Sequence, residues 1–168
     1  ILRYIKNGDV FQANFTQRFL SKIPNDFDEI HYYLHYRKKT ETPFSCLIKN
    51  QDFNILSYSP ERFLKLEKNK LKVSPIKGTI ERGQTLDEDI KLKKELSSSL
   101  KDKAENLMIV DVLRNDISEV CKAGSVKVTR LAEVETYNNV HHLVSDIEGT
   151  LDKSSDIFDV LRHCMPGG

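Results

Sequence analysis

The chain has 168 residues, of which 39% are hydrophobic and 30% charged, and its 26 basic side chains nearly balance its 25 acidic ones. A formal net charge of +1 argues against a nucleic-acid-binding domain or a surface for anionic membranes, both of which need a basic face. No apolar run approaches the roughly 20 residues that a membrane-spanning helix requires, so we expect no membrane partner.

No repeat, low-complexity tract or flexible linker divides residues 1–168, and we therefore treat them as one unit. The chain begins at Ile1 within a helical pattern and stops at the loop-forming CMPGG, which favours an internal piece of a longer polypeptide. Cys46, Cys121 and Cys164 have no metal or redox spacing. That pattern favours small core residues in a protein of the reducing cytoplasm.

The first predicted elements are a helix end and a strand. Residues 1–6 are typical of the tail of a helix that ends at Asn7-Gly8. Residues 9–23 alternate polar and apolar side chains, and this pattern predicts a long strand that is half exposed to a cleft or to solvent.

A helix and a group of short strands are predicted next. Residues 25–39 repeat apolar positions at helical spacing, with Asn25 or Asp26 as the cap. The strand patterns that follow are separated by turn signals and cover residues 44–50, 53–59, 62–68 and 70–75. Such closely spaced strands predict an antiparallel meander.

The second half changes its period to that of helices and then returns to strands. Residues 85–99 predict a mostly solvated helix that breaks at the serine run, and residues 100–124 a second, more amphipathic helix. Strand patterns follow over residues 125–130, 133–137 and 140–151. Residues 155–164 predict a last helix, capped by Ser155 or Asp156. Antiparallel strands, then helices, then strands again predict an α+β fold.

A lysine in an unusual setting is the first candidate for chemistry. In SPIKGTIERG, residues 74–83, Lys77 follows a strand pattern; Pro75 presets φ there, and Gly78 lets a backbone or a ligand approach closely. A lysine amine is a nucleophile only when it is neutral, which requires desolvation or a nearby cation. The alternative is an ordinary solvated charge at a strand end.

Two glutamates are the next candidates. Glu61, in SPERF, lies at a strand-initiating turn about one hairpin before Lys77 and could lie near it, unless it is only a surface charge. Glu105 shares the apolar side of its helix with Met108 and Ile109. A carboxylate on a buried stripe needs a partner, either an arginine in a structural ion pair or a metal ion.

His142 completes the candidates. Adjacent histidines on a strand point to opposite faces, so either His141 or His142 faces a cleft if one is present. On the preceding helix, Asp111, Arg114 and Asp116 are typical of structural ion pairs. The sequence contains no phosphate-binding loop, dinucleotide fingerprint or zinc spacing. These patterns alone do not specify a substrate.

Six segments resemble, in order, the motif series of the chorismate-utilising enzymes: GDVFQANFTQRF, SPERFLKL, PIKGTIERG, KDKAENLMIVDVLRND, GSVKV and VHHLVSDIEGTL. Within that family, ANFTQRF and the lysine of PIKGT are similar to the branch that aminates chorismate for para-aminobenzoate and folate synthesis. Anthranilate synthases carry a VVPSQRF-type segment and an alanine instead. The resemblance implies that residues 1–168 are the N-terminal and central part of a chorismate-binding catalytic domain, incomplete at both ends.

The resemblance also implies roles for single residues. Lys77 would attack ring carbon 2 of chorismate while the 4-hydroxyl leaves, and Glu61 would protonate that hydroxyl as general acid. Ammonia would then attack carbon 4 and expel the lysine, giving 4-amino-4-deoxychorismate with overall retention. His142 would lie near the leaving hydroxyl, and Gly78 and Thr79 would line the pocket with backbone groups.

A metal and a partner are implied in the same way. Glu105 would be one ligand of a Mg²⁺ ion that binds the ring carboxylate and helps keep Lys77 neutral. Ammonia would come from a separate glutamine amidotransferase subunit. The family pattern continues beyond PGG with a second magnesium-binding glutamate and with substrate-carboxylate binders, so we expect the 168-residue chain to be inactive alone. GTIERG has Glu81 where the family more often has proline, and we expect Arg82 to keep its place.

Three other interpretations of the function remain open at this point. Anthranilate synthase component I would eliminate pyruvate and would need no lysine nucleophile. Isochorismate-type enzymes use water and fit the Lys77 context less well. The third reading is a non-catalytic relative that only binds a glutaminase partner, which an intact set of Glu61, Lys77, Glu105 and His142 argues against.

Overall fold

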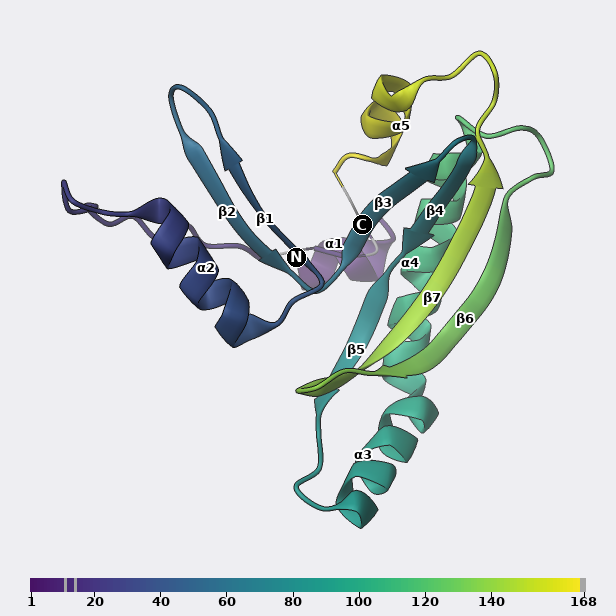
Figure 1. The fold of residues 1–168 in the computed structure, drawn as a ribbon. Helices are drawn as coiled ribbons and strands as arrows, with labels where there is room; N and C mark the ends of the chain where they lie inside the picture. The colour runs from purple at the N-terminus through teal and green to yellow at the C-terminus, as the bar shows by residue number, and fades with distance from the viewer. Residues whose placement is uncertain (11, 14, 167–168) are drawn as a thin grey trace.

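The structure is a computed structural model that describes residues 1–10, 12, 13 and 15–166 (Figure 1). The helices of this part are α1 (Leu2–Asn7), α2 (Glu29–Thr40), α3 (Leu86–Ser98), α4 (Leu100–Ser118) and α5 (Ile157–Cys164). The strands are β1 (Phe44–Lys49), β2 (Asn54–Ser59), β3 (Arg62–Glu67), β4 (Lys70–Ser74), β5 (Ile76–Glu81), β6 (Lys127–Thr136) and β7 (Val140–Thr150). Antiparallel sheets with flanking helices confirm the predicted α+β class.

The long strand β7 is the centre of the larger sheet. β4 and β5 lie end to end along one edge of β7, and β6 pairs with its other edge (Figure 1). β3 completes the sheet beside β4. Because β7 is flanked on both sides along most of its length, its residues 141–147 are all buried.

β1 and β2 form a separate hairpin, so the predicted single meander is wrong. β3 turns away from β2 at a corner where the Ser59 hydroxyl accepts a hydrogen bond from the Glu61 N–H and donates one to the Glu61 carbonyl. This side chain satisfies backbone groups that a continued ladder would otherwise pair. The corner separates the two sheets and carries Glu61.

The hydrophobic core lies between α4 and the sheet. The buried positions of α4 recur at helical spacing, at Asn106, Ile109, Val110, Leu113 and Ile117. They pack against Leu71, Val73 and Ile147 of the strands, and Val160 and Cys164 of α5 close one end. Cys121 also lies in this core, whereas Cys46 on β1 is exposed, so the core assignment is wrong for that cysteine.

The predicted strand over residues 9–23 is wrong for the part that is described. Its described residues form neither helix nor strand, and Phe15 and Phe19 are 92% and 83% exposed. A strand is stable only when its backbone pairs with a neighbour, and alternation alone does not supply one. Residues 11 and 14 lie outside the described residues.

Element boundaries depend on caps that pattern alone does not reveal. Helix α2 begins after Asp28, whose carboxylate accepts hydrogen bonds from two backbone N–H groups of the first turn, rather than after Asn25 or Asp26. Helix α4 ends at Ser118 instead of running to residue 124. Asp156 caps α5, one of the two residues predicted for that role. None of the described helices is long and apolar enough to cross a membrane.

β6 and β5 also differ from the prediction. The two strand patterns at 125–130 and 133–137 form one strand, β6, which is interrupted by register shifts and by Ala132 at a φ of 50°. β5 was not predicted, and Lys77 lies within it rather than at the end of a strand. This strand runs directly on from β4 after Pro75 and positions the candidate site.

Candidate functional site

Lys77 lies in a bulge of β5. Two residues, Lys77 and Gly78, lie opposite a single residue of β7, Leu143. The register of the ladder shifts between Ile76 and Thr79, which defines the extra residue. Bulges redirect side chains and are common beside active sites. The lysine is therefore half-buried in an irregular part of an otherwise regular sheet.

Gly78 is required by its conformation and by its neighbours. Its φ is +92°, a region that side chains with a Cβ rarely adopt. A Cβ at this position would lie 2.9 Å from the Cβ of Asp102, in the first turn of α4, and 3.2 Å from a methyl group of Leu96. The glycine thus allows the start of α4 to pack against the strand beside Lys77.

Glu61 reaches the same strand from the corner between the two sheets. Its Oε1 accepts a hydrogen bond of 2.9 Å from the backbone N–H of Ile76, the residue before Lys77. The carboxylate remains exposed. Two candidates that are 16 positions apart in sequence are therefore held at neighbouring positions.

His142 is directed away from the helices. Thr79 Oγ1 and His142 Nδ1 are 2.8 Å apart, across the β5–β7 ladder. The imidazole contacts the edge of the Tyr137 ring, with 5.4 Å between centroids. It lines a cavity of about 240 Å³ together with Pro60 and the β6–β7 turn. Burial lowers the pKa of His142, so the ring is neutral near pH 7.

His141, by contrast, is fully buried beneath the sheet and bonds Asp89 of α3. The prediction that the adjacent histidines point to opposite faces, with one of them at a cleft, is confirmed.

Glu105 is not on the buried stripe of α4, and that prediction is wrong. Half of its side chain is exposed, and its nearest cation, Lys101, is 3.9 Å away. The buried position is the next one, Asn106, which donates to the Leu143 carbonyl and accepts from the Ser145 hydroxyl. An asparagine can satisfy these partners beneath a sheet without burying a charge, whereas a carboxylate could not.

A magnesium ion fits Glu105 only as one ligand among several. Within the described ranges, no group of three His, Cys, Asp or Glu side chains is arranged to hold a metal ion. An exposed carboxylate does suit Mg²⁺, which binds through one or two carboxylates and keeps several waters. Farther along α4, Asp111 and Arg114 form the predicted structural ion pair at 2.8 Å.

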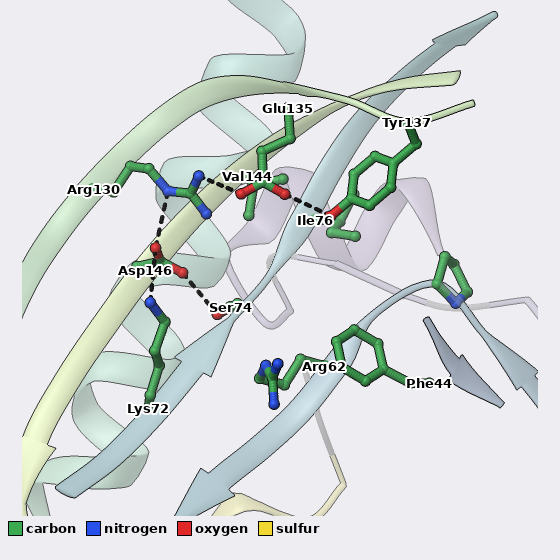
Figure 2. Close-up of a pocket in the computed structure, with 11 residues that line it drawn as sticks. Phe44, Arg62, Lys72, Ser74, Ile76, Arg130, Glu135, Tyr137, Val144 and Asp146 are labelled. Carbon is green, nitrogen blue, oxygen red and sulfur yellow. Dashed lines mark hydrogen bonds and ion pairs between the residues drawn. The ribbon is translucent and has the colours of Figure 1, made fainter. Parts of the chain in front are cut away.

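A second cavity, of about 210 Å³, lies on the open face of the sheet (Figure 2). A charged network forms one wall. Asp146 of β7 accepts hydrogen bonds or ion pairs from Ser74 at 2.7 Å, Arg130 at 2.9 Å and Lys72 at 3.0 Å. Sequence reasoning missed this network, although the alternation of β7 could have shown that Asp146 shares a face with His142.

Tyr137 connects the two cavities, because it lines both of them. Its hydroxyl donates to Glu135 at 2.6 Å, and Glu135 in turn pairs with Arg130 (Figure 2). Burial and this carboxylate raise the pKa of Tyr137 to about 12. The phenol therefore stays protonated and donates a hydrogen bond, and its ring packs against the ring of His142.

The structure does not bring the four candidate side chains into one cavity: His142 lines the cavity beside the β6–β7 turn, whereas Glu61, Lys77 and Glu105 line neither of the two cavities described above. In the part of the chain that the structure describes, no hydrogen bond or ion pair joins Glu61, Lys77, Glu105 and His142. An amine, two carboxylates and an imidazole are nevertheless the groups that can serve as nucleophile, general acid, ligand and base toward a small molecule.

These features define an α+β domain with two cavities beside its central strand. The sequence model described as chorismate binding enzyme matches residues 1–168, and the chain belongs to this family. It is 45% identical over 172 residues to "Aminodeoxychorismate synthase, chloroplastic" of Arabidopsis thaliana, covering 99% of this chain and 18% of that protein. It is 42% identical over 168 residues to "Aminodeoxychorismate synthase component 1" of Escherichia coli, covering 100% of this chain and 37% of that protein.

A solved structure agrees with the fold. Anthranilate synthase component I from Streptococcus pneumoniae superimposes with a TM-score of 0.73 at 29% identity, over 84% of this chain and 30% of that one. The chain thus spans well under half the length of the relatives that it matches. The resemblance inferred from the motifs is confirmed at the level of the family and of the named relatives.

Proposed function

We propose that the chain is part of an enzyme that aminates chorismate at ring carbon 4 to give 4-amino-4-deoxychorismate. One observation carries this proposal: Lys77 lies in the β5 bulge, between the backbone group that Glu61 holds and the Thr79–His142 pair. A lysine held in an irregular strand beside a carboxylate and a neutral imidazole suits covalent catalysis better than a solvated strand end does.

The proposed reaction has two displacements. The neutral amine of Lys77 forms a bond to carbon 2, both double bonds of the ring shift by one position, and the bond from carbon 4 to its hydroxyl breaks. Glu61 gives its proton to that oxygen, which leaves as water. Ammonia then bonds to carbon 4, both double bonds return to their first positions, and the bond between carbon 2 and Lys77 breaks. Glu61 takes the proton from the incoming amine.

His142 and Thr79 act beside this pair. His142 is neutral, and Thr79 holds one of its ring nitrogens, so the other is available to hydrogen-bond the leaving hydroxyl. Gly78 and Thr79 would line the substrate pocket with backbone groups of the bulge. Glu105 would be one ligand of a Mg²⁺ ion, whose charge would neutralise a carboxylate of the substrate.

The proposal includes a partner and a location. Ammonia would be supplied by a separate glutamine amidotransferase, and the enzyme would work in the cytoplasm. The 168-residue chain alone is expected to be inactive, since the second glutamate of the magnesium site and the groups that bind the substrate carboxylates are expected outside it.

Product analysis of the complete polypeptide that contains this chain tests the proposal. With chorismate, Mg²⁺ and an ammonium salt, and without glutaminase, mass spectrometry should find aminodeoxychorismate with its enolpyruvyl side chain retained. Formation of anthranilate and pyruvate would contradict the proposed reaction and would show that the enzyme is an anthranilate synthase. Absence of any turnover would favour a role restricted to binding a partner.

Variants of Lys77 test the covalent route. We expect Lys77→Ala to lower the rate of amination by about 10³-fold or more, since removal of a nucleophile disables both displacements. Lys93→Ala, at an exposed position of α3, is the matched control and should retain the wild-type rate. Amination by Lys77→Ala at the wild-type rate would exclude the lysine adduct.

A further inference from the structure

Beneath the candidate site, the carboxylate of Asp89 in α3 accepts four hydrogen bonds. Arg82 donates two of them, from Nε at 2.7 Å and from Nη2 at 2.9 Å. The backbone N–H of Gly83 donates at 2.9 Å, and His141 Nε2 lies 3.0 Å from the same carboxylate. A bidentate guanidinium–carboxylate pair with added backbone donors is among the most directional interactions in proteins.

These contacts join three parts of the chain. Asp89 lies on α3, Arg82 and Gly83 follow β5, and His141 lies on β7. Arg82 also donates from Nη1 to the Tyr137 carbonyl at 2.8 Å, and its backbone N–H donates to the Asn139 carbonyl at 3.2 Å. Tyr137 and Asn139 belong to the β6–β7 turn, which lines the same cavity as His142. One side chain of α3 therefore holds both the strand that carries Lys77 and the turn beside His142.

The carboxylate also fixes the tautomer of His141. Hydrogen bonds from Arg82 hold the pKa of Asp89 far below its usual range, so it is ionised and can only accept. His141 Nε2 must therefore carry the proton when the ring is neutral. Its Nδ1 then accepts from the Thr136 hydroxyl, 2.9 Å away. Both nitrogens of this fully buried ring are satisfied, and the ring is locked at both ends.

At this contact α3 leaves no room for a side chain on Gly83. A Cβ on Gly83 would lie 2.2 Å from the backbone nitrogen of Asp89. The helix backbone thus sits directly on the chain that leaves β5. His142 follows His141 on the same strand and points to the other face. The contacts that fix the position of His141 therefore also fix the backbone from which the His142 side chain extends.

We propose that Asp89 is a positioning residue for the candidate site. Through Arg82 and His141 it fixes β5, β7 and the β6–β7 turn relative to one another, and thereby holds His142 against Thr79 and at the cavity. Its effect on turnover rests on the proposed function, whereas its effect on His142 can be measured without catalysis.

Nitrogen NMR of the histidine rings in the 168-residue chain measures that effect directly. In the wild-type chain, a neutral His141 should show its proton on Nε2, beside Asp89. Asp89→Asn keeps the shape but brings an amide N–H₂ against donors, and should shift the ring signals of both His141 and His142. Asp87→Asn, at an exposed position of the same helix turn, should shift neither. Unchanged His142 signals in folded Asp89→Asn would overturn the proposal.

Kinetics of the complete enzyme provide the second measurement. Asp89→Asn should lower kcat/KM by about 10-fold or more and should move the pH profile that reports His142, because small misplacements near reacting groups are costly. Val160→Ala, in the core at the far end of α4, serves as a control that destabilises the fold without contacting the network. An equal loss in both variants with an unchanged pH profile would show that Asp89 acts only on stability.

A conservative variant covers the case in which Asp89→Asn does not fold. Asp89→Glu keeps the charge and the acceptors but lengthens the side chain, and should give a folded protein whose His142 signals move less. His142 signals identical to wild type in Asp89→Glu would count against the proposal. If the wild-type enzyme has no activity with chorismate, the proposed function fails, while the NMR comparison still decides the role of Asp89.

Discussion

The two faces of β7 differ in the kind of polar group that they carry. On the face covered by α3 and α4, each polar group is neutral or paired and lies out of water: His141 with Asp89, and Ser145 with Asn106. On the open face, Asp146 joins a network of long charged side chains that line a cavity. Successive residues of one strand thus belong to different environments.

The difference separates what holds the fold from what contacts a ligand. Buried networks on the covered face fix a unique arrangement, because any lost partner leaves a polar group without water. Charges on the open face keep part of their hydration, so individual interactions there contribute less to stability. We therefore expect substitutions of similar size to have unequal effects on the two faces.

The covered face should be most sensitive at its apolar centre. Ile147→Ala is expected to lower the free energy of unfolding by about 2–5 kcal/mol, since this fully buried side chain would leave a cavity against α4. Urea titration followed by circular dichroism measures the change. Leu131→Ala, at a half-exposed residue of β6, should change stability by less than about 0.5 kcal/mol. Equal losses would contradict the division between the faces.

Asn106 tests the buried polar part of the same face. Asn106→Ala should cost about 1–3 kcal/mol of unfolding free energy, because the Ser145 hydroxyl and the Leu143 carbonyl would lose their partner. The same urea titration applies. Asn115→Ala, at an exposed position of α4, is the matched control. A loss no larger than in the control would mean that water replaces the asparagine.

Tyr137 tests the open face. Tyr137→Phe removes only the hydrogen bond to Glu135 and keeps the ring beside His142. The expected loss of unfolding free energy is about 1 kcal/mol, since Glu135 keeps its pairing with Arg130. Tyr4→Phe on α1 should have no effect, because that ring is half exposed. A loss of unfolding free energy as large as for Asn106→Ala would show that the open-face network contributes as much to stability as the buried networks of the covered face.

The sequence could predict the elements with strong periodicity but not their partners. Helices α3 and α4, and the cap of α5, follow from spacing and from capping residues, which act locally. The strand expected over residues 9–23 was wrong because pairing depends on a distant neighbour. β5 was missed because Pro75 and Gly78 are typical of a turn, whereas pairing with β7 keeps this segment extended.

The candidate site shows the same limit. Motif resemblance singled out Lys77, Glu61 and His142; the fold places Lys77 and His142 on the paired strands β5 and β7, and the Glu61 side chain reaches the backbone of β5. The predicted position of Glu105 on the buried side of α4 was wrong. The buried stripe contains the next residue, Asn106, whose side chain has hydrogen-bond partners beneath the sheet. Asp89 was not considered, since its four donors come from segments that only the tertiary structure brings together.

The pH dependence of stability gives the smallest expected effect and concerns His142 alone. Burial lowers the pKa of His142 below its ordinary value of 6.5, so the folded chain holds this ring neutral where the unfolded chain begins to protonate it. The unfolded state then binds more protons, and the free energy of unfolding falls as the pH decreases below about 6.5. The loss should level off below the folded pKa.

Replacing the imidazole by an amide in His142→Gln should flatten this part of the profile. A slope in His142→Gln as steep as in the wild type would assign the titration to another group. It would contradict the conclusion that the folded chain holds His142 neutral.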